Sequence, residues 1–451
     1  MEKDRNTLVL YSDAVCNLKC RYCFIDKNPA LLQIDALLDE SFKGDYYFEF
    51  AKKVFPDPMQ LHEIQIWGGE PTLEIERTFH TIRKLIEYYP RLDAFMMSTN
   101  ATMDDWIDKL YSLFDVICEH EDRKFLFNLQ LSIDGPTPIN DLNRGTGVTE
   151  KFTKNFIKLV TTIDGYLDKH PNLEINAHFK PTLDNSSIEW LQTKERVLDY
   201  YKFFNHYMQI AGRVFSERFS FAQAVPNTAV PSPHTKEDGI RFANLCRFTR
   251  EIEKENSENR ILSHYTNITP YADVLSGVNA DTKDINYCNS GACGSGKCVL
   301  GLLPGNTISG CHNGFTQLLE DYKKYCAQHT ANDENITIDE SLFSSNTIQN
   351  DMVFPLSHLK DYEEQVEEFY DPEAKCQVNN VIMEIIFLAR TGLIDEKYTR
   401  KEEAIRGAKF ILSHTSYCMR DNLGTTGCKA IIPTGLIKLL LNGAIDIIEE
   451  E

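Results

Sequence analysis

The sequence predicts an α/β fold with a partial (β/α)6 barrel, followed by a small Cys-rich β-hairpin and helical domain. Two observations predict it. Short β-branched and aromatic runs alternate with helical patterns through the first half of the chain, and strands separated by helices form parallel sheets with right-handed crossovers. From about residue 288 cysteine and glycine become frequent, and from residue 376 the apolar spacing is helical.

Six segments have the composition of the barrel strands, at 6–12, 63–67, 94–99, 125–133, 174–182 and 213–223. Helical patterns follow over 73–89, after residue 104, over 151–170 and over 187–207. The stretch 29–60 is predicted to be an insertion that contains a helix. Because active sites of parallel α/β sheets lie at the carboxyl ends of strands, we expect functional residues there.

Changes in composition divide the chain into four predicted parts. The barrel covers 1–224, and a linker rich in proline and threonine with a helical connection covers 225–287. The Cys-rich domain covers 288–375, and a helical region covers 376–451.

Composition excludes several classes of protein. The net charge of -20 over 451 residues argues against a nucleic-acid or anionic-membrane surface. No apolar run at the N-terminus suits a signal peptide, and none approaches the roughly 20 residues of a membrane span. We therefore expect a cytoplasmic protein, in which metal or redox chemistry is favoured over disulfides for the 13 cysteines.

Three cysteines, Cys16, Cys20 and Cys23, occupy the segment after the first predicted strand. A closed structural metal site needs four ligands, so three leave one position for another group. At this spacing, three thiolates can bind three irons of a [4Fe-4S] cluster and leave the fourth iron open. The cysteines alone also allow a zinc site or chance clustering.

The C-x3-C-x2-C spacing, followed by the aromatic Phe24, resembles the signature of the radical SAM superfamily. The resemblance implies that the cysteines are catalytic cluster ligands and that Phe24 contributes to the cofactor site. It also implies that S-adenosyl-L-methionine (SAM) chelates the open iron through its amino and carboxylate groups. One-electron reduction would then cleave SAM to a 5'-deoxyadenosyl radical, which abstracts hydrogen from a substrate.

Motifs after the next two strands resemble the family's cofactor site. In WGGEP (67–71), Gly68 and Gly69 would let the backbone approach the methionine moiety, and Glu70 would accept from its ammonium group. An ordinary turn between strand and helix also favours two glycines. Asn100 ends the third strand, where the family often has a polar residue, although a helix N-cap would explain it equally well.

The fourth strand ends in LSIDGP (131–136), which also resembles the family. Ser132 would lie near the ribose, and Arg144 matches an arginine that salt-bridges the cofactor carboxylate. Asp134 and Asp141 are candidates for a base acting on substrate, but an Asp-Gly pair is also common in turns.

A second group of cysteines surrounds VLGLL-PGN-TIS (299–309), which is predicted to be a β-hairpin. It resembles the SPASM or Twitch extension of radical SAM enzymes. The resemblance implies at least one auxiliary [4Fe-4S] cluster. Its ligands would be Cys288, Cys293, Cys311 and, from the C-terminal region, Cys376, with Cys418 and Cys428 as alternatives.

Two features of this second group leave alternatives open. The C-x2-C-x5-C-x3-C run of a full SPASM domain is missing, so one auxiliary cluster is predicted and a second would need an unorthodox set of ligands. A structural zinc ribbon would explain the same cysteines. Cys298 is a candidate ligand or hydrogen-atom donor to a substrate radical, or simply a hairpin residue.

The motifs together predict a radical SAM oxidoreductase that modifies a peptide or protein in the maturation of a natural product, by crosslinking, epimerisation or oxidation. One alternative is a formylglycine-forming enzyme like the anaerobic sulfatase maturases, and another is a small-molecule dehydrogenase or mutase. Outside enzymes, the alternatives are an iron–sulfur electron carrier and a zinc-binding protein.

The same resemblance predicts two further partners. A reductase, flavodoxin or ferredoxin would supply electrons. Because the first strand begins by residue 7, we expect no winged-helix leader-binding domain before it. Either a separate leader-binding protein would then be a partner, or the leader would bind another surface of this chain.

Overall fold

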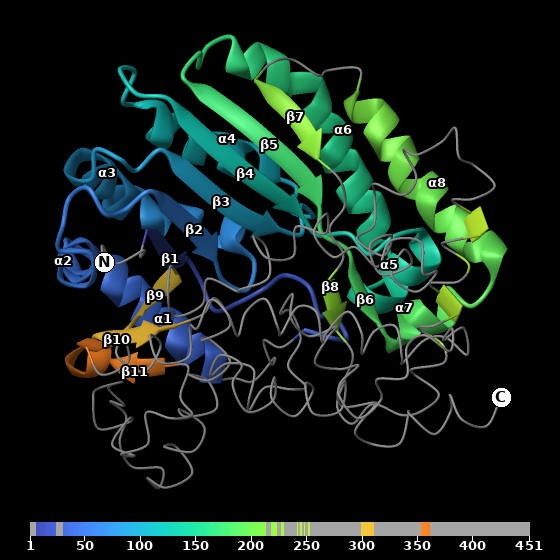
Figure 1. The fold of residues 1–451 in the computed structure, drawn as a ribbon, viewed down its shortest axis with the longest axis horizontal. Coiled ribbons are helices and arrows are strands. Elements are labelled where there is room, and N and C mark those ends of the chain that lie inside the picture. Colours follow the sequence, from blue (N-terminus) through green and yellow to red (C-terminus); the bar gives the residue numbers. More distant parts are fainter. Residues whose placement is uncertain are drawn as a thin grey trace, which may run out of the picture.

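A computed structural model describes residues 6–23, 30–212, 218–222, 227–229, 299–310 and 353–360, and single positions within 241–252. These residues form a nine-stranded sheet, in the order β11-β10-β9-β1-β2-β3-β4-β5-β7, and a separate pair of strands, β6 and β8. Figure 1 shows helices α4 and α6 behind the large sheet.

Six parallel strands form the centre of the sheet. They are β1 (Thr7–Tyr11), β2 (Glu63–Trp67), β3 (Ala94–Thr99), β4 (Phe125–Leu131), β5 (Leu173–Phe179) and β7 (Phe219–Ala222). Each pairs in parallel with the next in this order. All six lie within or next to the strands predicted from the sequence, and they confirm the parallel α/β fold.

Helices connect these strands. They are α1 (Ala30–Phe42), α2 (Tyr46–Val54), η1 (Pro71–Leu73), η2 (Ile75–Thr78), α3 (Phe79–Tyr88), α4 (Trp106–Cys118), α5 (Thr137–Arg144), α6 (Val148–Leu167), α7 (Asn185–Trp190) and α8 (Lys194–Ala211). The insertion after β1 contains two helices. Helix α5 is an addition to the prediction, because TPINDLNR is too polar and too short for a clear apolar period.

The sheet buries one face of its strands against helices. In β4 the residues Phe125, Phe127, Leu129 and Leu131 are buried, and the alternate residues are partly exposed. The Phe127 ring lies 4.8 Å from the ring of Phe114 in α4, edge to face. Because side chains alternate along a strand, the intervening residues point away from this helical layer.

The predicted hairpin is confirmed. Strands β9 (Val299–Leu303) and β10 (Thr307–Ser309) pair antiparallel, and the turn residues Gly305 and Asn306 have φ of 71° and 55°. Both values are left-handed, which glycine and asparagine tolerate best. A third strand, β11 (Val353–Pro355), pairs with β10 and is followed by η5 (Leu356–His358).

The hairpin is attached to the edge of the parallel sheet. Strand β9 pairs in parallel with β1, and Gly301 lies so close to Tyr11 that a Cβ there would be 3.0 Å from the Tyr11 ring. The backbone N–H of Asn306 donates to the Tyr46 hydroxyl of α2 at 2.8 Å. The sequence did not predict this attachment.

Two smaller findings complete the fold. Strands β6 (Thr182–Asp184) and β8 (Asn227–Ala229) pair in parallel beyond β5. Among the helices that the structure describes, none has the length and apolar character needed to cross a bilayer. The proposed domain boundaries after 224, 287 and 375 lie outside the described residues.

Phe127→Ala should destabilise the barrel by about 3–5 kcal/mol, because it leaves a cavity under α4 in a fully buried position. Ile157→Ala is the matched control, since Ile157 is 43% exposed in α6, and it should change the free energy of unfolding by no more than about 0.5 kcal/mol. Thermal and denaturant unfolding of the full chain measure both. Equal effects of the two substitutions would contradict this packing.

Candidate functional site

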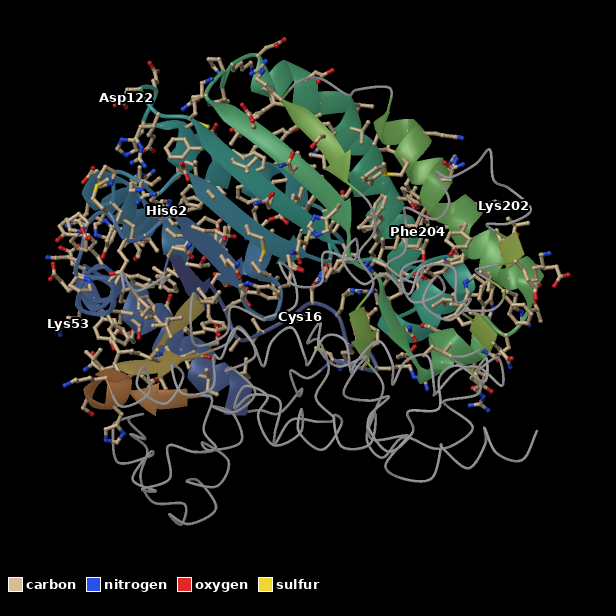
Figure 2. The ribbon with its side chains drawn as sticks, in the orientation of Figure 1. Cys16, Lys53, His62, Asp122, Lys202 and Phe204 are labelled. Atoms are coloured by element: carbon tan, nitrogen blue, oxygen red, sulfur yellow. The ribbon has the colours of Figure 1, made fainter. Side chains whose placement is uncertain are left out.

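The three cysteines of the first motif lie at the carboxyl end of the parallel strands. They follow β1, whose last residue, Tyr11, is paired with Trp67 at the end of β2. Figure 2 shows Cys16 at this end, far from Asp122 in the segment before β4. The loops after β1 to β4 therefore meet at one edge of the sheet, as expected from the sequence.

The three thiols of this loop have surroundings that distinguish them from a core cysteine. Cys16, Cys20 and Cys23 are partly exposed, whereas Cys118 is buried in α4. Burial, with Asp115 nearby, raises the pKa of Cys118 to about 12, so its thiol stays protonated. Among the four cysteines that the structure describes, only the three loop thiols combine access with a position at the strand ends.

The glycines of WGGEP pack against the backbone of the cysteine loop. A Cβ at position 69 would lie 1.8 Å from the carbonyl oxygen of Val15, and one at position 68 would lie 2.5 Å from Oδ1 of Asp13. The N–H of Glu70 donates to the Val15 carbonyl at 2.9 Å. The close approach that Gly68 and Gly69 permit is thus made to this loop, and an approach to the cofactor stays a prediction.

Glu70 joins the ends of β2 and β3. Its side chain is 2% exposed. Its Oε1 accepts from the hydroxyls of Thr72 and Thr99, both at 2.6 Å, and its Oε2 accepts from the N–H of Asn100 at 2.7 Å. Burial raises the pKa of Glu70, although these donors oppose the shift. Glu70 therefore links the ends of β2 and β3 through hydrogen bonds, which the sequence did not predict. Its contact with a cofactor ammonium stays a prediction.

Asn100 connects β3 to the first cysteine. Its Nδ2 donates to Oδ1 of Asn17 at 2.8 Å and lies 3.8 Å from Sγ of Cys16. Its Oδ1 accepts from the N–H of Thr102 at 3.0 Å, and Nδ2 of Asn17 donates to the Thr102 hydroxyl at 2.9 Å. The start of the cysteine loop is thereby fixed to the end of β3.

Asp134 is buried and surrounded by donors. It is 0% exposed and accepts from the Tyr22 hydroxyl at 2.7 Å, from Nη2 of Arg144 at 2.8 Å and from the N–H of Thr182 at 2.9 Å. Nδ2 of Asn143 lies 3.5 Å away. These contacts do not suit the predicted base, because a base must reach the substrate.

The guanidinium of Arg144 forms an ion pair within the protein. It is 6% exposed and forms a 2.8 Å ion pair with Asp134. Burial lowers the pKa of Arg144, but the attraction of Asp134 outweighs this and holds it well above the ordinary value. Its Nε is buried without a hydrogen-bond partner among the described residues. A salt bridge to a cofactor carboxylate stays a prediction.

Two other predicted residues have simpler surroundings. Ser132 is partly exposed, and its hydroxyl lies 3.4 Å from that of Ser98. Asp141 accepts from the N–H groups of Gly147 and Thr149 at the start of α6. Burial raises the pKa of Asp141, but the hydrogen bonds from Thr149 and Gly147 outweigh it and lower the pKa overall. Asp141 thus caps a helix, and its predicted role as a base has no support here.

Asp13, which lies just before the cysteine loop, is a further site residue that was not predicted from the sequence. Asp13 is fully buried, its Oδ1 accepts from the N–H of Gly69 at 2.7 Å, and its Oδ2 has no hydrogen-bond partner among the described residues. Burial and the nearby carboxylate of Glu70 raise the pKa of Asp13 well above its ordinary value. The signal that could have revealed it is a polar pair, Ser12 and Asp13, directly after an apolar strand.

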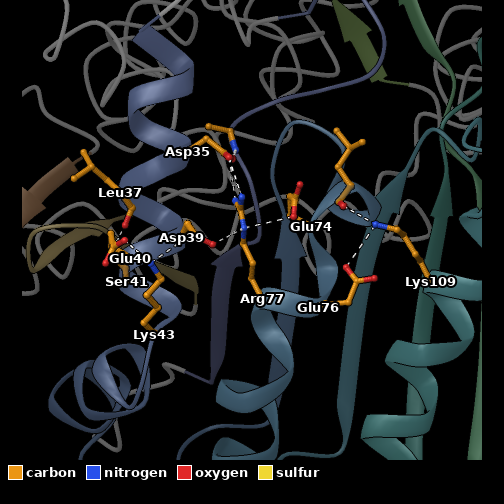
Figure 3. Close-up of polar contacts among 12 residues, drawn as sticks. Asp35, Leu37, Asp39, Glu40, Ser41, Lys43, Glu74, Glu76, Arg77 and Lys109 are labelled. Atoms are coloured by element: carbon orange, nitrogen blue, oxygen red, sulfur yellow. Dashed lines mark hydrogen bonds and ion pairs between the residues drawn. The ribbon is translucent and has the colours of Figure 1, made fainter.

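A second carboxylate supports the same loop from the insertion. Oδ1 of Asp35 in α1 accepts from the N–H of Ala14 at 2.9 Å, and its Oδ2 forms an ion pair with Arg77 at 3.1 Å. Arg77 also pairs with Asp39 at 3.1 Å (Figure 3). The insertion thus holds the start of the cysteine loop against η2.

The donor set of the loop, three cysteine thiols, suits a [4Fe-4S] cluster. A cluster binds its cysteines on different irons, so their sulfurs need not converge on one point. Three partly exposed thiols at C-x3-C-x2-C spacing meet that requirement.

Several predicted site residues lie outside the described residues. They are Phe24, Cys288, Cys293, Cys298, Cys311 and Cys376. The auxiliary cluster and the roles of these residues stay predictions.

Gly69→Ala should disrupt the cysteine loop, because its Cβ would overlap the carbonyl of Val15, a backbone atom that cannot move alone. We expect less iron bound after anaerobic reconstitution and a lower melting temperature. Gly165→Ala is the control, since a Cβ there meets nothing within 4 Å and alanine favours helix α6 by about 1 kcal/mol. Unchanged iron binding in Gly69→Ala would contradict the contact.

Asp13→Asn should flatten the dependence of stability on pH. Because the folded-state pKa of Asp13 is raised, its contribution is fully present below the unfolded pKa of about 3.9 and is lost as pH rises through the folded value. The melting temperature of the wild-type chain should therefore fall more than that of the variant as the pH rises above about 3.9.

The control for this comparison is Asp104→Asn, at a side chain that is 98% exposed. It should leave the pH dependence of the melting temperature as in the wild-type chain. The same pH dependence in all three proteins would contradict a buried Asp13 with a raised pKa.

Comparison with known proteins agrees with this site. No protein-family model matches the chain. A cysteine-type anaerobic sulfatase-maturating enzyme of Clostridium perfringens is 29% identical over 143 residues, which cover 30% of this chain and 35% of that enzyme. The match thus spans only about a third of the relative's length.

Two solved structures are also similar. Streptococcus suis SuiB aligns with a TM-score of 0.40 and 12% identity, covering 81% of this chain and 68% of SuiB. Native anSMEcpe with bound AdoMet aligns with a TM-score of 0.40 and 15% identity, covering 98% of this chain and 100% of that one. At these scores the two alignments carry no weight of their own. The cysteine motif, its position after the first of six parallel strands and the match to the sulfatase-maturating enzyme agree with the resemblance of the chain to radical SAM enzymes.

Proposed function

We propose that this chain is an enzyme that binds a [4Fe-4S] cluster through Cys16, Cys20 and Cys23, and SAM at the open iron. The observation that carries the proposal is the cysteine loop itself. It holds three partly exposed thiols at the carboxyl end of the sheet and is fastened to three neighbouring loops. A structural zinc site would instead need a fourth ligand.

A [4Fe-4S] cluster held by Cys16, Cys20 and Cys23 with SAM bound to it would supply one-electron reductive cleavage of SAM and abstraction of a hydrogen atom from the substrate. The protein's own residues hold and shield this site. Gly69 and Glu70 keep the second loop against Val15, and Asn100 holds the segment at Cys16. Ser132, which is partly exposed at the end of β4, is proposed to contact the cofactor.

We further propose a peptide or protein substrate. Polar side chains alternate with the buried ones and so occupy the face of the strands opposite the helices: Gln65, Ser98, Asn128, Gln130, Asn176 and His178. Oε1 of Gln130 is buried without a hydrogen-bond partner among the described residues. Side chains that donate and accept hydrogen bonds suit the amide groups of a peptide.

An auxiliary cluster and protein partners complete this proposal. Cys288, Cys293, Cys311 and Cys376 are the proposed auxiliary ligands, and Cys298 is a proposed hydrogen-atom donor. A reductase, flavodoxin or ferredoxin would reduce the clusters, and a leader-binding protein would present the substrate.

A second candidate is formylglycine formation. The similarity to a sulfatase-maturating enzyme favours it, because that enzyme acts on a protein. The missing cysteine run of a second auxiliary cluster argues against it. Incubation of the reduced enzyme with a sulfatase-derived peptide that contains cysteine, followed by mass spectrometry, distinguishes the two. A mass change expected of formylglycine would favour the second candidate, and an unmodified peptide would favour a different peptide substrate.

The chain, reconstituted anaerobically and reduced with dithionite, should convert SAM to 5'-deoxyadenosine. Replacing Cys16, Cys20 and Cys23 by alanine should abolish that product and remove about four iron atoms per chain. Cys118→Ala, which alters a buried thiol outside the site, should retain both. If the wild-type chain forms no 5'-deoxyadenosine, or if the triple variant forms as much as the wild type, the proposed function is wrong.

A further inference from the structure

We propose that Tyr22 and the buried pair of Asp134 and Arg144 form a clamp that positions Cys20 and Cys23 for the cluster. Tyr22 is then a positioning residue of the site, in addition to any contact that it makes with a cofactor. This inference rests on the proposed function, because it concerns ligands of the proposed cluster.

The clamp begins with the place of Tyr22 between two of the cysteines. Its hydroxyl donates to Asp134, with distances of 2.7 Å to Oδ2 and 3.0 Å to Oδ1. The Arg144 guanidinium lies over the Tyr22 ring, 5.6 Å from its centroid, and donates to the same carboxylate at 2.8 Å. Tyr22 is therefore held through both its ring and its hydroxyl.

The backbone of the same segment is also fixed. The N–H of Arg21 donates to the carbonyl of Asn143 in α5 at 2.8 Å, and the N–H of Cys23 donates to the carbonyl of Cys20 at 3.2 Å. The two cysteines therefore belong to one turn whose central residues are bound to α5. A shift of this turn would break the contacts of Arg21 and Tyr22 together.

The carboxylate at the centre of the clamp is itself fixed. The N–H of Asp134 donates to Oδ1 of Asn140 at 2.9 Å, and the N–H of Thr182 donates to Asp134 at 2.9 Å. Asp134 is 0% exposed and Arg144 is 6% exposed. A buried ion pair tolerates little displacement, because either charge left alone would be poorly solvated.

Cys16 is anchored by a different set of residues. Asn100 at the end of β3 lies 3.8 Å from its Sγ and donates to Asn17. The two anchors share none of these residues. Loss of the clamp should therefore increase the accessibility of the Cys20 and Cys23 thiols and leave that of Cys16 unchanged. A general loss of stability would increase the accessibility of all three.

Tyr22→Phe tests the clamp, since it removes the hydroxyl and keeps the ring under Arg144. The matched control is Tyr200→Phe, because the Tyr200 hydroxyl is buried near Asp134 without a hydrogen-bond partner among the described residues. In the metal-free full chain, alkylation by iodoacetamide is followed at each cysteine by mass spectrometry. Cys118, which is buried, reports global opening.

In Tyr22→Phe, Cys20 and Cys23 should react roughly ten- to a hundredfold faster than in the wild type, the range expected for one lost hydrogen bond to a charged group. Cys16 and Cys118 should react as before, and Tyr200→Phe should match the wild type throughout. Equal rates at all four cysteines in Tyr22→Phe and the wild type would overturn the clamp. A faster rate at Cys118 would mean that Tyr22→Phe unfolds the chain generally. The test would then be repeated with Arg144→Lys. Alkylation rates of Cys20 and Cys23 that match the wild type in this second variant would also overturn the clamp.

Reconstituted protein gives a second readout. The part of the electron paramagnetic resonance spectrum that changes when SAM is added belongs to the cluster with the open iron. In Tyr22→Phe this cluster should lose iron to a chelator faster, and its spectrum should change relative to Tyr200→Phe. A wild-type chain without a SAM-responsive cluster would overturn the proposed function. A normal wild-type cluster with an unchanged Tyr22→Phe would overturn the clamp alone.

Discussion

The site depends on one backbone contact, the packing of Gly69 against Val15. Strands β1 and β2 are neighbours, so the loops that follow them leave the sheet side by side. No side chain fits between them, because a Cβ at position 69 would be 1.8 Å from the Val15 carbonyl. The N–H groups of Gly69 and Glu70 then donate to Asp13 and to Val15. This contact places the cysteine loop, and the other contacts hold it in that place.

Three buried carboxylates hold the cysteine loop in place, and each has a different set of hydrogen-bond or ion-pair partners. Asp134 is paired with Arg144, Glu70 accepts from hydroxyl and N–H groups, and Asp13 accepts from one N–H and keeps one oxygen without a partner among the described residues. A buried carboxylate is costly unless donors surround it. Because the donors come from different loops, satisfying the carboxylates also fixes the loops relative to one another. Motif residues that are expected to bind a cofactor thus also fix the loops of the site relative to one another.

The sequence predicts the parts of this structure that depend on local pattern. Alternation in FLFNLQL identifies β4, and the turn residues around Asn306 identify the hairpin. It does not predict the pairing of β9 with β1 or the burial of Asp134, because both depend on residues far away in the chain. It also does not predict the ion pair between Arg144 and Asp134, because a single sequence cannot reveal that the residue ten positions earlier is the partner of Arg144.

The separation of the anchors has a chemical consequence for the site. The segment at Cys16 is fixed to the end of β3, whereas the turn with Cys20 and Cys23 is fixed to the end of β4 and to α5. The loop thus spans the ends of neighbouring strands, β3 and β4, which pair in register from Ala94 to Thr99. A rigid sheet then sets the separation between the two anchors. Because three ligands on different irons must keep fixed separations, a sheet serves this purpose better than a loop with a single attachment.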